Sequence, residues 1–171
     1  MAPIIRRPKA WLAAVLAFLL FVTACSAPKT ASRWEQTPTD TATQVDRSAI
    51  IQGGQFNAFF PTEGNGFERI YTQEKRGFAE AKLKQNGTDL AMLSVSDTAS
   101  NPQAAEKYFA SDSAIAGYPA TSIGSTATGV LVGDRLQVKV LSRSETFSAS
   151  DREQWIEKFD LDGLAQLANN S

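Results

Sequence analysis

An Asn-Gly pair between two runs of extended-strand character constrains the fold of this chain more than any other feature. Asn86 and Gly87 separate FAEAKLKQ from TDLAMLSV. A type I′ turn needs positive φ at both central positions, which this pair tolerates, so the stretch predicts a β-hairpin. Counting outward from the turn predicts four facing pairs: Gln85 with Thr88, Lys84 with Asp89, Leu83 with Leu90, and Ala81 with Met92.

A second hairpin is predicted around Gly133 and Asp134, which suit a type II′ turn. After the turn, Leu136, Val138 and Val140 alternate with polar residues, as in a half-buried antiparallel strand. Further strands are expected around the aromatic-rich GGQFNAFFP, in residues 67–73, and in IAGYPATSIG, where a proline interrupts the run.

Helix signals occur in the remaining segments. Asn101 suits a helix N-cap before Pro102. Ser150 and Glu153 have the spacing of a capping box, and the buried face of that helix is expected to carry Trp155.

The C-terminal stretch DLDGLAQLANN predicts a last short helix with Asp160 or Asp162 as its N-cap. Its start resembles a calcium loop but lacks the third oxygen ligand and the closing glutamate. The expected order is roughly four strands, a helix, three strands and a helical end. The sequence therefore predicts one α+β domain in residues 53–171, with an antiparallel sheet and two clear hairpins packed by a few helices.

The N-terminal segment has the features of an export signal. Arg6, Arg7 and Lys9 precede the unbroken apolar run Trp11–Val22. Twelve apolar residues are too few to span a bilayer as a helix, which needs about 20. A basic start, a short apolar run and small residues after it are typical of a secretory signal peptide, here residues 1–24.

The end of that segment, Val22-Thr23-Ala24-Cys25, resembles the lipobox of bacterial lipoproteins. The resemblance implies that the Cys25 thiol carries a diacylglycerol and that the signal is cleaved before Cys25. Two or three acyl chains hold a protein on a membrane far better than one. Two alternatives remain open: a secreted protein cleaved near Ala24, and an uncleaved anchor.

Residues 25–52 are predicted to be the lipidated cysteine and a flexible linker, because Thr, Ser, Ala and Pro dominate until Ile50. Beyond the lipobox, the stretches GGQFNAFFP, YTQEKRGFAEAKLK, LVGDRLQVKVLSR and SDREQWIEKFDLDGL resemble a group of uncharacterised cyanobacterial lipoproteins. That resemblance implies a location, in the periplasm or the thylakoid lumen, and no activity. A weaker similarity, in element order and the opening aromatic stretch, is to the PsbP-like fold.

Composition excludes several kinds of chemistry. The chain has no histidine, and Cys25 is its one cysteine, so Ser-His-Asp and Cys-His catalysis, ordinary zinc sites and an internal disulfide are all impossible. Residues 1–24 hold three basic and no acidic residues, so the remainder carries 14 basic and 18 acidic residues. This balance argues against nucleic acid as a partner. We expect no metal site and no cofactor.

One aromatic cluster could serve as a binding surface or an apolar pocket: Phe56, Phe59, Phe60 and Tyr71. The alternative is that these side chains belong to the hydrophobic core.

We therefore expect an exported protein that is held on a membrane through Cys25. Its predicted role is a non-catalytic binding or assembly module for a membrane-protein complex. The alternatives are a carrier or sensor of a small apolar ligand at the membrane surface, and an enzyme that uses carboxylate, lysine or serine groups.

Overall fold

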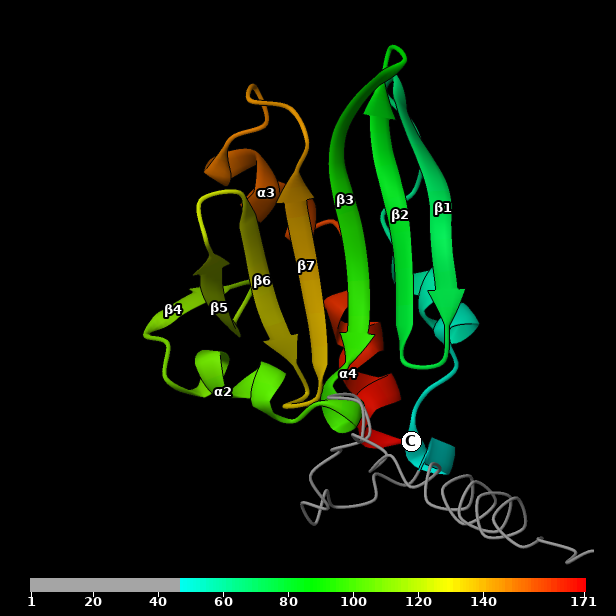
Figure 1. Cartoon of the computed structure of the whole chain (residues 1–171), viewed down its shortest axis with the longest axis vertical. Coiled ribbons are helices and arrows are strands. Elements are labelled where there is room, and N and C mark those ends of the chain that lie inside the picture. The colour runs from blue at the N-terminus through cyan, green and yellow to red at the C-terminus, as the bar shows by residue number, and fades with distance from the viewer. Residues whose placement is uncertain (1–46) are drawn as a thin grey trace, which may run out of the picture. The chain divides into compact units, whose positions relative to one another are not determined.

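The computed structural model describes residues 47–171, which form one α+β domain, as predicted. A seven-stranded antiparallel sheet runs through this part of the chain in the order β1-β2-β3-β7-β6-β5-β4 (Figure 1). The strands are β1 (Phe67–Lys75), β2 (Phe78–Gln85), β3 (Thr88–Asp97), β4 (Ser113–Ile115), β5 (Tyr118–Ile123), β6 (Ala127–Val132) and β7 (Leu136–Ser142).

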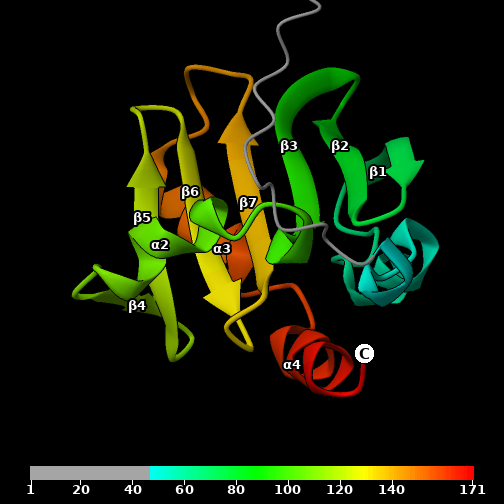
Figure 2. The same ribbon diagram turned by 60° about the horizontal axis from the view of Figure 1, so that its bottom comes forward.

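The two faces of the sheet are covered unequally. One face carries the 3₁₀ helix η2 (Gly53–Phe59), α3 (Ala149–Ile156) and α4 (Leu161–Asn169), and the main hydrophobic core lies beneath them. On the opposite face α2 (Gln103–Phe109) lies against β5 and β6 (Figure 2). There Tyr108 and Leu131 form a small second cluster with Ala105. The sheet therefore has one fully packed face and one that is covered mainly at one side.

The predicted element order is wrong at the start of the domain. Three strands precede α2 and four follow it, and GGQFNAF forms η2 instead of a strand. Phe59 and Phe60 follow Phe56 by three and four residues, and a helical turn brings side chains with this spacing to one side. A strand would have sent neighbouring Phe59 and Phe60 to opposite faces.

The first hairpin turn is confirmed. Asn86 and Gly87 have φ values of 49° and 79°, as a type I′ turn requires. The two pairs nearest the turn also match the prediction: Gln85 with Thr88 and Lys84 with Asp89.

The two outer pairs were predicted wrongly, because a β-bulge shifts the register between Leu83 and Lys84. The pairs found are Leu83 with Ala91, and Ala81 with Leu93. The shift brings Ala91, Leu93 and Val95 of β3 onto the face that β2 buries, and all three are fully buried. Without the bulge, Leu90 and Met92 would have pointed there instead.

The other turns differ from the prediction in detail. Gly133 and Asp134 both have positive φ, 57° and 53°, which fits a type I′ turn and not the predicted type II′. The stretch predicted as one interrupted strand is a third hairpin, β4–β5, which turns at Ala116 and Gly117 with φ values of 50° and 84°.

Two helix starts are shifted. Ser148, not Ser150, caps α3, and its capping box is completed by Asp151. The helix α2 begins at Gln103 with Pro102 in the cap position. The predicted Asp160 cap of α4 is confirmed, since its carboxylate accepts a 2.8 Å hydrogen bond from the Gly163 N–H.

The packed domain begins before residue 53. Ile50 and Ile51, predicted to be linker, are 8% and 4% exposed, and Ile51 belongs to the main core. The Gly77 N–H donates to the Ile51 carbonyl over 2.7 Å. A Cβ at Gly53 would collide with the Lys75 and Phe78 carbonyl oxygens, so the chain passes closely over the β1–β2 turn. Residues 50–52 are therefore part of the fold, because two consecutive isoleucines bury apolar surface there.

One buried ion pair joins the first described segment to the sheet. The Asp97 side chain is completely buried and accepts 2.9 and 2.8 Å hydrogen bonds from the Arg135 guanidinium. It also accepts from the Ile51 and Ala99 N–H groups, each over 3.0 Å. Arg135 in turn donates to the backbone carbonyls of Ala49 and Ser171. Both ends of the domain are thus tied to the same pair.

We predict that Asp97→Asn lowers the free energy of unfolding by about 3 kcal/mol, because it leaves the Arg135 cation without its anion. Urea unfolding would measure this loss. Asp134→Asn is the matched control: its carboxylate is exposed, its positive φ suits Asn, and its effect should stay within about 0.5 kcal/mol. Equal losses in both variants would contradict a special role for the buried pair.

The same pair predicts that the domain becomes less stable in acid. Burial by itself raises the pKa of Asp97, but hydrogen bonds from Arg135, Ile51 and Ala99 outweigh it and hold the pKa below the ordinary value of 3.8. The stabilisation is complete above pH 3.8 and is lost as the pH falls through the lowered pKa. Thermal midpoints between pH 2 and 7 should fall more steeply for the wild type than for Asp97→Asn. Parallel curves would rule this contribution out.

Candidate functional site

The predicted lipobox, Val22, Thr23, Ala24 and Cys25, lies outside the residues that the structure describes. Lipid attachment at Cys25 therefore stays a prediction from the sequence. Within residues 47–171 no helix is both long enough and apolar enough to cross a membrane.

Two of the four residues of the predicted aromatic cluster lie in the core. Phe56 is 0% and Phe60 3% exposed, and both belong to the main core. Phe60 packs against Phe159, with 5.1 Å between ring centroids. Phe59 is half-buried against the core and Tyr71 is 38% exposed, so solvent reaches only these two.

Tyr71 is held in place by its own contacts. Its hydroxyl donates to the Asn57 carbonyl over 2.9 Å, and the Arg69 guanidinium lies 5.0 Å from its ring centroid. Arg69 also donates to the carbonyls of Phe60 and Pro61, over 3.2 and 2.7 Å. Burial raises the pKa of Tyr71. These contacts fasten the 60–61 loop to β1, so they account for the cluster as structure.

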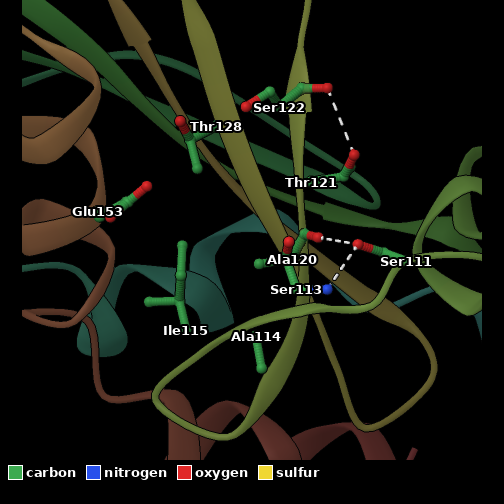
Figure 3. A pocket seen from close by; sticks show the side chains of 9 residues that line it. All are labelled: Ser111, Ser113, Ala114, Ile115, Ala120, Thr121, Ser122, Thr128 and Glu153. Carbon is green, nitrogen blue, oxygen red and sulfur yellow. Dashed lines mark hydrogen bonds between the residues drawn. The ribbon is translucent and has the colours of Figure 1, made fainter.

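A hollow of about 380 Å³ lies near the edge of the sheet opposite β1, between α3 and the strands β4 and β5 (Figure 3). Figure 3 shows the Glu153 side chain reaching from α3 toward the strands, with Thr128 and Ser122 on one side and Ile115 on the other. Hydroxyl groups dominate its lining, which consists of Ser111, Ser113, Ala114, Ile115, Ala120, Thr121, Ser122, Thr128 and Glu153.

The wall of this hollow is fixed by a buried arginine. Arg152 is 5% exposed, and its Nε donates to the Thr128 hydroxyl oxygen over 2.9 Å. Its other nitrogens donate to the Ser142 hydroxyl over 2.9 Å and to the Ser125 carbonyl over 3.4 Å. No carboxylate within residues 47–171 pairs with Arg152. The Thr128 hydroxyl accepts from a cation, so it retains its own proton for donation.

Glu153 is the one charged residue that lines the hollow. It is exposed, and no described residue forms an ion pair or hydrogen bond with its carboxylate. Arg152 precedes it on α3 but directs its donors to hydroxyl and carbonyl oxygens. The hollow thus presents a carboxylate beside several hydroxyl groups, a set that suits a ligand with hydrogen-bond donors.

The hollow also borders a free strand edge. The pairing of β4 with β5 ends at Ser113 and Ala120. Beyond it, the Ser111 hydroxyl donates to the Ala120 carbonyl and accepts from the Ser113 N–H (Figure 3). Among the described residues, no strand pairs with Thr121, Ser122 and Ile123 on the side away from β6.

A second hollow, of about 320 Å³, lies beside residues 61–65 and α3. Phe67 and Trp155 meet there in a T-shaped arrangement with 4.9 Å between centroids. Lys158 Nζ lies 4.0 Å from the Trp155 centroid and covers it. Because the Lys158 ammonium group already covers this aromatic pair, we take the hydroxyl-lined hollow as the candidate site.

Sequence reasoning missed every residue of that hollow. Its members come from α3, from the strands β4, β5 and β6, and from the loop before β4. The sequence signal is only an excess of Ser and Thr between residues 111 and 128. Within the described part of the chain no group of three or more acidic, cysteine or histidine side chains could hold a metal ion.

Comparisons of the chain with known protein families, with curated proteins and with solved structures found no match. The resemblances to a cyanobacterial lipoprotein group and to the PsbP-like fold therefore stay predictions.

We predict that Thr128→Val lowers the free energy of unfolding by about 1–3 kcal/mol, because it leaves a buried Arg152 N–H without an acceptor while keeping the side-chain shape. Thr121→Val is the control, since Thr121 also lines the hollow and makes only a 3.4 Å bond to the neighbouring Ser122 carbonyl. Urea unfolding would compare the two. Losses of similar size would show that Arg152 does not depend on Thr128.

Proposed function

We propose that this chain is an exported lipoprotein, anchored through Cys25, whose domain is a non-catalytic binding module for a partner at the membrane. The observation that carries the anchor is the Val22-Thr23-Ala24-Cys25 motif directly after a short apolar run with a basic start. Cys25 has no second cysteine to pair with, so attachment of a lipid accounts for its presence at that position.

The layout of the domain supports this proposal. The first described residues reach Arg135 and Asp97, at the end of the sheet where Val132 pairs with Leu136. The hydroxyl-lined hollow contains Thr128, next to the opposite end of the same pairing, where Ala127 faces Leu141. The described chain thus enters at one end of this strand pair, and the Ser122 and Thr128 side of the hollow lies toward the other.

The apolar-ligand alternative has less support. It needs the aromatic cluster to line a cavity, and Phe56 and Phe60 fill the core instead. The hydroxyl-lined hollow has polar walls, which suit a protein or peptide partner better than a small apolar ligand.

The anchor is tested by expressing the full chain in a bacterium that processes lipoproteins, then extracting the membranes with detergent. Mass spectrometry should show that the processed chain begins at Cys25. The mass of its N-terminal peptide should include a diacylglycerol and an added acyl chain. Cys25→Ala should leave the membrane fraction, because no acyl chain can attach. Ser26→Ala, beside the motif, is the control and should behave as the wild type. An unmodified Cys25 on a chain cleaved near Ala24 would overturn the proposal.

Binding is tested separately by crosslinked recovery from the native membranes. The wild type should bring down one defined set of membrane proteins, and Cys25→Ala should lose it. Equal recovery by both forms would show that binding does not need the anchor. Recovery of no defined set by either form would contradict the binding module.

A further inference from the structure

We propose that the free edge of β5 and the hydroxyl-lined hollow bind an extended peptide segment of a partner protein, added to the sheet as a strand in line with β4. The segment places a Lys or Arg side chain beside Glu153. This inference rests on the proposed binding function and names its ligand.

The backbone of β5 provides the main-chain part of the site. The Ala120 carbonyl faces away from β6, because it accepts from the Ser111 hydroxyl on the β4 side. Peptide groups two residues apart in a strand point the same way, so the Ser122 N–H and C=O also face outward. Among the described residues, that carbonyl accepts only a 3.4 Å hydrogen bond from the neighbouring Thr121 hydroxyl. An unpaired donor and acceptor at a sheet edge are a template for strand addition.

The hollow supplies the side-chain part. Ser122 faces Thr128 across β5 and β6, so both side chains lie on the sheet face that α3 covers. Alternate side chains of an added strand would point to that same face and enter the hollow. There they would meet the Ser122 and Thr128 hydroxyls and the Glu153 carboxylate.

The negative charge of Glu153 determines which peptide side chain the site prefers. Glu153 has no partner in the described part of the chain, and a Lys or Arg of the peptide would provide one. The buried Arg152 cation nearby reduces the attraction, and Glu153 is exposed. The gain from this pair is therefore modest, and most of the affinity comes from the main-chain hydrogen bonds.

The test begins with a displayed library of random heptapeptides, selected on the purified full chain in detergent. We expect enriched sequences in which β-branched residues flank a Lys or Arg. Amide hydrogen exchange of the wild-type chain should then show protection of the Ser122 N–H when a selected peptide is added. This readout needs no substitution in the domain.

Two variants and two controls locate the binding. Glu153→Gln should weaken the selected peptide about three- to fivefold. Glu157→Gln, on the exposed end of the same helix, should not change it. Ser122→Pro removes the outward N–H at an edge position that tolerates proline, and should weaken binding about tenfold. Ala149→Pro, at the first position of α3, is the matched proline control.

Several outcomes would overturn the inference. A library that yields no sequence, or sequences without a basic residue, would do so, as would binding without protection of Ser122. If the Ser122 N–H is already protected in the chain alone, the chain's own residues occupy the edge and no partner segment is needed. None of these results changes the outcome of the anchor test, which measures the lipid on Cys25. Failure of the peptide proposal is therefore distinct from failure of the anchored-module proposal.

Discussion

The structure depends first on the buried pair of Asp97 and Arg135. A completely buried carboxylate is tolerated only when its charge and its lone pairs are satisfied, and here four hydrogen bonds do so. The donors lie in the turn directly after β3, in the β6–β7 turn and in the segment before η2. Since Arg135 also donates to the Ala49 and Ser171 carbonyls, this one side chain joins the segment before η2 to the residues that follow α4.

A second constraint is the unequal covering of the sheet. The helices η2, α3 and α4 bury one face, while α2 lies against β5 and β6 on the other. At the β4 side the short edge strand stops at Ser113, and the Ser111 hydroxyl ends its ladder. The half-open edge beside α3 follows from this early stop. The hollow with hydroxyl groups and the Glu153 carboxylate in its walls lies beside this edge.

Local signals predicted the fold class and the positions of two hairpin turns correctly. Asn86 and Gly87 adopt the expected turn because the two residues tolerate positive φ, whatever surrounds them. Signals that compete with packing were less reliable. The bulge beside Leu83, the 3₁₀ course of η2 and the burial of Ile50 and Ile51 all arise because side chains must meet the core. The candidate site was not predictable, because Glu153 approaches Ser122 only after α3 packs on the sheet.

By itself, the sequence determined the turn at Asn86 and Gly87, the α+β class and the exclusion of histidine and disulfide chemistry, since these depend on residue type and local spacing. It also carries the motif at Cys25 on which the proposed anchor rests. Only the tertiary structure decided that the domain begins by Ile50, that Phe56 and Phe60 are core, and that β5 keeps a free edge. The physical reason is that burial and strand pairing depend on residues far apart in the chain, which local patterns do not record.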